Sequence, residues 1–368
     1  MMNIFIYNGP NKAFNKYIPK DNLTNFLDFI QSHDKENRRF MVVVKGQEDE
    51  YSGEEEEIEN LIIHSTDYSS VAEHVIENFI NFLRQFKINN LYIHNPPMQI
   101  LTKILQVYSK VKIHNFRYET ININKLRDMK ENFSKRIIGQ EEVKEQLLSA
   151  LYPLSKKDNT KPVVIMFYGP SGVGKTETAK YIGEILKGKI LRKQFSMFQN
   201  NDFSTYLFGG KYSQGSFTKD LLERESNVIL LDEFDKSHSV FHSAFYEFFD
   251  EGIMEDKNYR VDVKNSVIVC TSNYKSIEDI RKSLGDPIYS RFDAVIRFNK
   301  LDIKSIHEII HREYNCEFNK LSENEQYIVK KYDIEQKLII NANKFTNVRE
   351  IKVNIKNMIY LVITREIL

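Results

Sequence analysis

The chain has 368 residues, with 41% hydrophobic residues, 28% charged residues and a formal net charge of +1. This composition is typical of a soluble globular protein, and the length exceeds what one hydrophobic core usually holds, so we expect two or three domains. The near-zero net charge gives no general basic surface for nucleic acid, and the two cysteines exclude a disulfide scaffold. No apolar run reaches membrane-spanning length, and the N-terminus lacks the apolar stretch of a signal peptide. We therefore expect a cytoplasmic protein without a membrane partner, and the composition does not indicate a nucleic-acid partner.

The first region, residues 1–123, alternates short apolar runs with helical patterns and predicts a small, separate α/β domain. Strands are predicted over Asn3–Tyr7, Phe40–Lys45, Asn60–His64, Asn90–His94 and Val111–Tyr118. Helices are predicted over Leu23–Ser32, Tyr68–Phe86 and Met98–Tyr108. The region resembles no family that we recognise.

Three histidines, His64, His94 and His114, end or nearly end three of these predicted strands. If the strands are parallel, the imidazoles lie at the carboxyl edge of the sheet, where α/β proteins bind ligands. One interpretation is a metal or anion site. The other is three polar caps on buried strands, and this second interpretation is favoured.

The rest of the chain divides into a polar linker, residues 124–136, a second region of alternating strands and helices, residues 137–300, and a mostly helical third region, residues 301–368. The last helical pattern places five apolar residues on one stripe, at spacings of three and four. They are Val348, Ile351, Ile355, Met358 and Val362.

A phosphate-binding loop opens the second region. Val163–Tyr168 is a continuous apolar run, as expected for a strand buried on both faces. It leads into residues 169–176, Gly-Pro-Ser-Gly-Val-Gly-Lys-Thr, and a helical pattern follows. This is the context of the GxxxxGK[ST] motif, whose glycines let successive N–H groups face one anion at a helix N-terminus. The predicted ATP contacts are Gly169, Pro170, Ser171, Gly172, Val173, Gly174, Lys175, Thr176 and Glu177.

Within this loop, Lys175 is expected to reach the β- and γ-phosphates and Thr176 to bind Mg²⁺. A second buried strand, Val228–Leu231, ends at Asp232 and Glu233. We expect Asp232 to hold the same Mg²⁺ through water and Glu233 to polarise the attacking water. A third apolar strand, Val267–Thr271, is followed closely by Asn273, which could orient that water. The sequence therefore predicts an ATP-hydrolysing enzyme.

Taken in chain order, these segments resemble the AAA+ ATPases, and among them the Clp unfoldases and disaggregases. The resemblance covers about residues 136–368 and depends on five segments in the right order. The segments are Ile138-Gly139-Gln140, Leu230–Lys236, Cys270–Asn273, Pro287–Asp293 and Asn347–Arg349. It implies an α/β fold, in which a P-loop AAA+ parallel-sheet core is followed by a C-terminal helical lid domain.

The resemblance also assigns roles to residues. It implies that the backbone of Ile138 and Gly139 lies near the adenine and that Asn273 is the polar sensor of the γ-phosphate. Arg291 matches the arginine finger, which would enter the site of a neighbouring subunit, so hydrolysis would need a ring, typically a hexamer. Arg349 matches a lid arginine that acts within its own subunit. A guanidinium suits both roles because it stays charged and offers a planar set of donors to phosphate oxygens.

Two departures from the family pattern concern partners. Where Clp unfoldases carry a glycine-aromatic-valine-glycine pore loop, this chain has Phe208 at the aromatic position, followed by Gly209 and Gly210. The glycine before the aromatic is replaced by Leu207. Residues 274–287 lack the loop that joins Clp ATPases to their peptidase, so we expect no peptidase partner.

Two hypotheses for function follow. The first is a Clp-like ring that remodels or unfolds a protein substrate, with residues 1–123 as its recognition domain. The alternative is an ATP-gated oligomeric scaffold that recruits a partner through the same domain without threading it. The sequence identifies neither the substrate nor the biological process.

Overall fold

The computed structural model of the chain describes residues 2–31, 57–71, 73–197, 202–236 and 239–368. The described residues divide into two compact units. The first comprises residues 1–118, 199–225 and 253–263, and the second comprises residues 119–198, 226–252 and 264–368. No helix in the described part of the chain is both long enough and apolar enough to cross a membrane. The strand predicted over Phe40–Lys45 lies outside the described residues.

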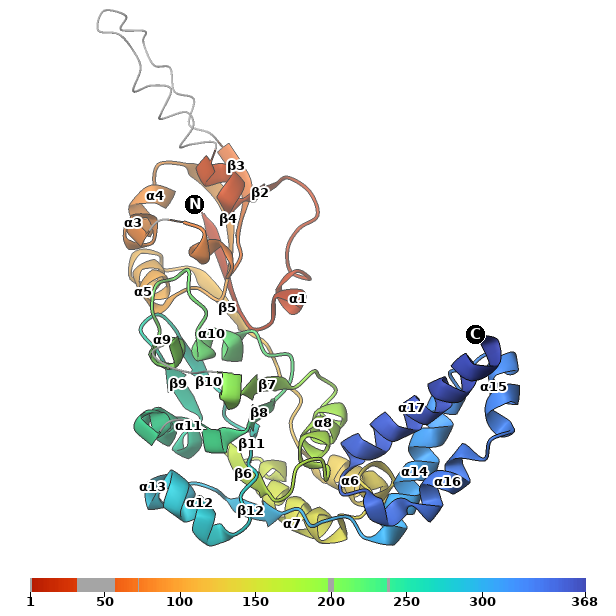
Figure 1. Cartoon of the computed structure of the whole chain (residues 1–368). Coiled ribbons are helices and arrows are strands. Elements are labelled where there is room, and N and C mark those ends of the chain that lie inside the picture. Colours follow the sequence, from red (N-terminus) through yellow and green to blue (C-terminus); the bar gives the residue numbers. More distant parts are fainter. Residues whose placement is uncertain (1, 32–56, 72, 198–201, 237–238) are drawn as a thin grey trace, which may run out of the picture. The chain divides into compact units, whose positions relative to one another are not determined.

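The first unit is built on a five-stranded parallel sheet of order β2-β3-β4-β1-β5. Its strands are β1 (Asn3–Asn8), β2 (Leu23–Asn25), β3 (Glu57–Ile63), β4 (Lys87–His94) and β5 (Val111–Asn115). Helices cover one face of this sheet, and they are α3 (Glu73–Glu77), α4 (Phe79–Leu83) and α5 (Met98–Val107) (Figure 1). Side chains alternate along a strand, so Ile4 and Ile6 of β1 face these helices, whereas Phe5 and Tyr7 face the short helix α1 (Asn11–Phe14).

Two predicted helices of this unit differ in the structure. Leu23–Ser32 begins as the short strand β2, because residues 23–25 pair with β3, and residues 26–31 are helical. Tyr68–Phe86 is not one helix but a 3₁₀ turn, η1 (Asp67–Ser69), followed by α3 and α4. Serines and asparagines compete for backbone hydrogen bonds and so favour helix ends. Accordingly, Asn78 stands at the start of α4 and donates its side-chain N–H to the carbonyl of His74.

Two later pieces of chain complete the first unit. One carries α9 (Asp202–Phe208) and α10 (Phe217–Leu222), and the other is the antiparallel hairpin of β9 (Ile253–Glu255) and β10 (Arg260–Asp262). From sequence alone, both pieces were expected to belong to the ATPase region, residues 137–300. In the structure they group with the N-terminal sheet, and the ring of Tyr212 packs against the sheet's hydrophobic core.

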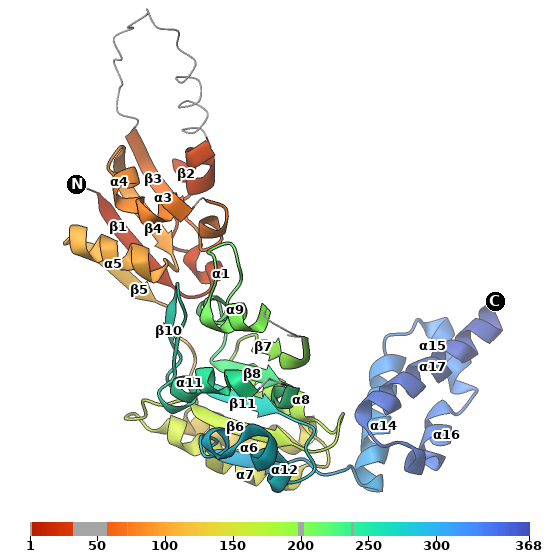
Figure 2. The same ribbon diagram turned by 60° about the vertical axis from the view of Figure 1, so that its left-hand side comes forward.

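The second unit contains a five-stranded parallel sheet of order β12-β6-β11-β8-β7. Its strands are β6 (Val163–Tyr168), β7 (Leu191–Gln194), β8 (Val228–Asp232), β11 (Val267–Thr271) and β12 (Ala294–Arg297). Every residue of β6, β8 and β11 is buried, as their apolar sequences predict. The core helices are α6 (Ile123–Arg136), α7 (Glu141–Leu151) and α8 (Lys175–Ile185) (Figure 2). Shorter elements are η2 (Tyr152–Ser155), η3 (Phe195–Met197), η4 (Phe234–Lys236), η5 (Ser239–Phe245), α11 (Tyr246–Asp250), α12 (Ile277–Leu284) and α13 (Asp286–Tyr289).

The segment predicted as a polar linker, residues 124–136, lies entirely within helix α6. Asn122 caps the helix by accepting the N–H of Lys125, and Leu126, Met129 and Phe133 are buried in the core of the second unit. Apolar residues at spacings of three and four are the pattern of an amphipathic helix. The many charged residues between them conceal this pattern.

The C-terminal region is a helical lid with its own apolar core. It consists of α14 (Ile303–Phe318), α15 (Glu323–Lys330), α16 (Ile334–Ile340), η6 (Ala342–Lys344) and α17 (Val348–Ile367). The predicted stripe on the last helix faces this core, with Ile351, Ile355 and Val362 buried. Val348 and Met358, also on the stripe, are partly buried against the same core.

Candidate nucleotide site

The phosphate-binding loop joins the end of β6 to the start of α8. Gly169, Gly172 and Gly174 have φ angles of +130°, +74° and +115°, which residues with a side chain rarely adopt. The loop is also tightly packed at this point, because a Cβ on Gly169 would lie 2.3 Å from the carbonyl oxygen of Phe298. The glycines of the motif are therefore needed both for the turn of the backbone and for its close packing.

Lys175 is the first residue of α8, and its ammonium group points back into the loop. Its Nζ donates to the carbonyl oxygens of Gly169 and Pro170, at 2.6 and 2.7 Å, and to Oδ1 of Asn273, at 3.1 Å. Burial lowers the pKa of Lys175 to about 8, although the negative charge of Asp232 acts in the opposite direction. The loop thus holds a buried cation at the place where the motif predicts phosphate.

The acidic pair lies at the carboxyl end of β8. Oδ2 of Asp232 accepts hydrogen bonds from Nε and Nη2 of Arg192, at 2.9 and 2.5 Å, and Oδ1 accepts one from the hydroxyl of Thr271. Glu233 has a φ of +56°, and its carboxylate accepts a hydrogen bond of 3.1 Å from Gln194. A residue with a side chain at such an angle typically costs about 1–3 kcal/mol, and such angles are common at functional sites.

These groups line one cavity of about 650 Å³. The predicted site residues that line it are Ile138, Ser171, Gly172, Val173, Gly174, Lys175, Thr176, Glu177, Asp232, Glu233, Asn273 and Arg349. Three other predicted contacts lie just behind the lining. Gly169 and Pro170 hold Lys175, and Gly139 packs so closely on the lid that a Cβ there would meet Oγ of Ser305 at 2.5 Å.

The lid is tied directly to the phosphate-binding loop. The N–H of Val348 donates to the carbonyl of Gly172 at 3.0 Å, and a Cβ on Gly172 would lie 2.8 Å from Cβ of Asn347. Asn347 caps α17 by accepting the N–H of Glu350. Arg349 follows immediately and lines the cavity, so the geometry joins the nucleotide loop to the helix that carries this arginine.

Several lining residues were not predicted as site residues from sequence, and many of them are charged or polar. The charged ones and Gln194 are Arg136, Lys180, Arg192, Gln194, Arg312, Glu313 and Lys352. Arg192 and Gln194 reach the site because β7 pairs with β8 in a register that sets Gln194 opposite Asp232. The four-residue strand β7 is half-buried and lacks a continuous apolar run, so its sequence does not clearly predict a strand.

Arg291 does not line this cavity. It borders another one, where its Nε pairs with Asp250 at 2.9 Å, its Nη1 donates to the carbonyl of Pro287, and its guanidinium stacks over Tyr246. Phe208 belongs to the first unit, where it ends α9 with 46% of its surface exposed. Gly209 follows with a φ of +79°, and the carbonyl of Gly210 accepts a hydrogen bond from Asn258.

In the first unit, the three histidines stand at the carboxyl edge of the parallel sheet, each with its own partner. His64 contacts Asn11 at 3.2 Å, His94 contacts the carbonyl of Gly9 at 2.7 Å, and His114 contacts the hydroxyl of Tyr17 at 2.9 Å. Among the described residues, no three His, Cys, Asp or Glu side chains are grouped to hold a metal ion.

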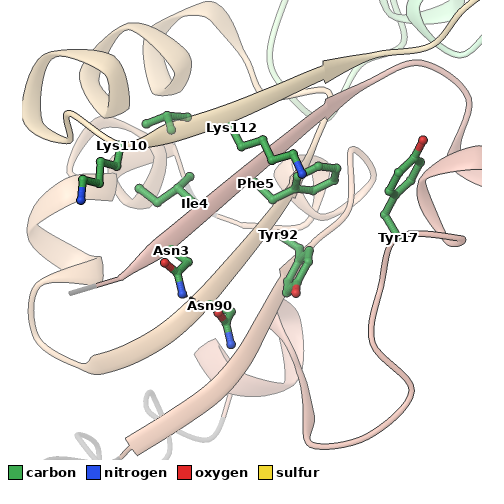
Figure 3. Close-up of a pocket in the computed structure, with 9 residues that line it drawn as sticks. Asn3, Ile4, Phe5, Tyr17, Asn90, Tyr92, Lys110 and Lys112 are labelled. Atoms are coloured by element: carbon green, nitrogen blue, oxygen red, sulfur yellow. Dashed lines mark hydrogen bonds between the residues drawn. The ribbon is translucent and has the colours of Figure 1, made fainter.

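The face of this sheet opposite α3–α5 carries a cavity of about 570 Å³, shown in Figure 3. Its lining includes the aromatic rings of Phe5, Tyr17 and Tyr92, and the ammonium of Lys112 lies 5.9 Å from the centre of the Phe5 ring. The remaining lining residues are Asn3, Ile4, Asn90, Lys110 and Val111. Parallel sheets are usually covered on both faces, whereas in the described part of the chain Phe5 and Tyr92 are only half-buried here and Tyr17 is exposed.

Comparisons with known proteins agree with the geometry of the second unit. A family model described as AAA domain (Cdc48 subfamily) matches residues 160–320. The chaperone protein ClpB of Yersinia enterocolitica is 33% identical over 181 residues, which are 45% of this chain and 20% of that protein. The AAA+ ATPase ClpV1 of Pseudomonas aeruginosa is 35% identical over 173 residues, which are 44% of this chain and 19% of that protein. Among solved structures, the S. cerevisiae Hsp104-ADP complex is similar over 59% of this chain and 46% of the chain in that structure, with 21% sequence identity and a TM-score of 0.47.

The parallel sheet, the phosphate-binding loop and the acidic pair define a nucleotide-binding AAA+ ATPase, and the family model covers all three. Within that class, this part of the chain is similar to the Clp-type AAA+ ATPases, among them ClpB and ClpV1. Each match covers only about a fifth of the relative's length.

Proposed function

We propose that the chain couples ATP hydrolysis at the cavity of the second unit to the remodelling of a protein substrate within a ring of subunits. The observation that supports hydrolysis best is the convergence of Lys175, Asp232 and Glu233 on one cavity, from the segments that follow β6 and β8 on either side of β11. The site thus combines a cation for the phosphates with two carboxylates for metal and water.

The donor set suits magnesium, because Mg²⁺ prefers oxygen ligands and is usually held by few protein groups plus phosphate. We propose that the hydroxyl of Thr176 and the carboxylate of Asp232, the latter through water, hold the ion. Its chemistry would be to neutralise charge on the β- and γ-phosphates. Glu233 would orient and polarise the attacking water, and Asn273, which already contacts Lys175, would fix the γ-phosphate end of the site.

The ring is proposed from the position of Arg291. This arginine lies outside the cavity lined by Lys175 and Glu233, so it cannot be assigned to the site of its own subunit from the geometry. In a ring, its guanidinium would serve the γ-phosphate of a neighbour, where it would stabilise the charge of the transition state. We propose six subunits, by likeness to Clp ATPases.

The remodelling activity is proposed from Phe208. A phenylalanine with nearly half its surface exposed, followed by two glycines, is suited to contact a polypeptide that passes by. One of the matched relatives is a chaperone protein, ClpB. We propose further that the N-terminal domain recognises the substrate and that its open face, with Phe5, Tyr17 and Tyr92, contacts an unfolded segment with aromatic side chains.

The test uses two substitutions in the full chain. Glu233→Gln should bind ATP but hydrolyse it at least about a hundredfold more slowly, because water is no longer polarised. In that background, fluorescently labelled casein should be retained with ATP, as measured by co-elution on a sizing column. Phe208→Ala should lose this retention, and Phe208→Tyr, the matched control, should keep it. Equal retention by all three forms would reject Phe208 as the substrate contact.

A further inference from the structure

A crevice at the carboxyl edge of the first unit's sheet is occupied by a side chain from the chain's own later segment. The strands β1, β3 and β4 end there, and each is followed by a polar turn. In parallel α/β sheets this edge is the usual place for a ligand, because the loops that follow the strands leave a crevice there. Here the occupant is the carboxylate of Glu223, the residue that caps α10.

Three donors hold the Glu223 carboxylate. Oε1 accepts the hydroxyl of Ser65 at 2.6 Å and the side-chain N–H of Asn95 at 3.0 Å, and Oε2 accepts the backbone N–H of Asn11 at 3.0 Å. Each donor follows a different strand. Hydrogen bonds to a charged acceptor are stronger than those between neutral groups.

The imidazole of His94 lies behind this carboxylate, 3.7 Å away, and is fully buried. Burial lowers the pKa of His94, with Glu223 acting in the opposite direction, so the ring stays neutral at neutral pH. The carboxylate is therefore held by an array of hydrogen bonds and not mainly by an ion pair.

Further hydrogen bonds attach the loop before α10, which follows Phe208 in the chain, and the β9–β10 hairpin to the N-terminal domain. The hydroxyl of Ser69 donates to the carbonyl of Tyr212, whose phenol donates in turn to Gln99. The N–H of Met98, at the start of α5, donates to the carbonyl of Asn258 at 2.8 Å.

The β9–β10 hairpin continues this connection. Asn258 donates its side-chain N–H to the carbonyl of Gly210, and the N–H of Lys257 donates to the carbonyl of Phe208 at 3.0 Å. The backbone on both sides of Gly209 is thus connected to the N-terminal domain through two residues of the hairpin.

We propose that the N-terminal domain is a clamp on the Phe208 segment, residues 206–216, and that Glu223 closes the clamp. While its carboxylate fills the crevice, α10 and the preceding loop are fixed to the sheet, and so is the backbone that presents Phe208. Removing Glu223 from the crevice releases that segment without altering the nucleotide cavity, whose lining contains no residue of the first unit. Glu223 is thus a positioning residue for Phe208.

Hydrogen–deuterium exchange on the full chain tests the clamp directly. Glu223→Ala loses three hydrogen bonds, so amides in residues 206–216 should exchange at least about tenfold faster. Glu223→Gln keeps the shape and one acceptor oxygen, and should give a smaller increase. Glu225→Ala, which alters an exposed neighbour, is the control and should match the unchanged protein.

Two results would overturn the proposal. One is unchanged exchange in residues 206–216 of Glu223→Ala. The other is faster exchange throughout β1 and β4 as well, because Glu223 would then support the whole domain and not the segment in particular.

The role of Phe208 in remodelling rests on the proposed function, whereas the exchange experiment does not. If the clamp opens in Glu223→Ala but casein retention in the Glu233→Gln background is unchanged, the clamp stands and the remodelling role of Phe208 fails.

Discussion

At the scale of single residues, the ammonium of Lys175 is the group whose charge state should control nucleotide binding. Its pKa is lowered to about 8 by burial, so the cation is largely present at pH 7 and largely lost at pH 9. The phosphates of ATP are attracted to the charged form of Lys175, and bound phosphate in turn stabilises that charged form. Affinity for ATP should therefore fall as the pH rises through 8, by about tenfold between pH 7 and pH 9.

Fluorescence titration with a labelled ATP analogue at a series of pH values measures this effect. Lys175→Arg is the matched control, because a guanidinium stays charged over the whole range. Whatever the size of its affinity for ATP, that affinity should not vary with pH. A flat profile for the unchanged protein would show that Lys175 keeps its proton throughout.

How well sequence predicts the site also differs by residue. The contacts of the phosphate-binding loop and the acidic pair at Asp232 could be predicted because each lies in one short segment after a buried strand. Arg192 could not, because it reaches Asp232 only through the pairing of β7 with β8. The roles proposed for Arg291 and Arg349 depend on a family resemblance, whereas Asn273 is also indicated by its place just after a buried strand.

At the scale of elements, the contact between α17 and the phosphate-binding loop should contribute to stability. The side chain of Asn347 caps α17, and its neighbour Val348 donates to the loop carbonyl of Gly172. Asn347→Ala removes the capping acceptor and should lower the free energy of unfolding by about 1 kcal/mol.

Urea unfolding followed by circular dichroism, with and without ATP, measures this change. Asn347→Asp keeps an oxygen acceptor at the cap and should be close to the unchanged protein. If Asn347→Ala and Asn347→Asp have the same unfolding midpoint, the cap does not contribute to the stability of the lid.

Elements with a continuous apolar run, such as β6, β8 and β11, were predicted closely from sequence. Two kinds of element were not. Helix α6 was read as a linker because charged residues separate its buried positions Leu126, Met129 and Phe133. Strand β2 was read as the start of a helix because its three residues are extended only through pairing with β3. Tertiary contacts decide such short segments, and local preference does not.

At the scale of the whole molecule, the proposed sharing of sites between subunits makes a prediction for mixtures. Arg291→Ala alone should bind ATP but hydrolyse little, and so should Glu233→Gln alone. When the two variants are mixed, some sites pair an intact Glu233 with an intact Arg291 from the neighbour. The mixture should therefore recover a measurable part of the activity, as followed by phosphate release.

The control mixes Arg291→Ala with the double variant Arg291→Ala/Glu233→Gln, in which no intact arginine exists. That mixture should stay inactive at every ratio. Normal turnover by Arg291→Ala alone would contradict a shared site, and recovery in the control mixture would show that the arginine is not needed.

The division of the chain into units was the part least accessible from sequence. The boundary near residue 123 was predicted from a change of pattern, and the first unit's leading segment ends nearby, at residue 118. That residues 199–225 and 253–263 join the same unit could not be foreseen. Their attachment depends on contacts such as Glu223 with Ser65, between residues distant in sequence.

Because the two units alternate along the chain, the first unit cannot be completed early during synthesis on the ribosome. The N-terminal sheet emerges first, yet the ring of Tyr212 and the carboxylate of Glu223 that complete its unit are synthesised much later. Residues 119–263 take roughly 10 to 30 s to translate at ordinary rates. During that interval the nascent sheet exposes both the polar crevice that Glu223 later fills and the part of its apolar core that Tyr212 later covers.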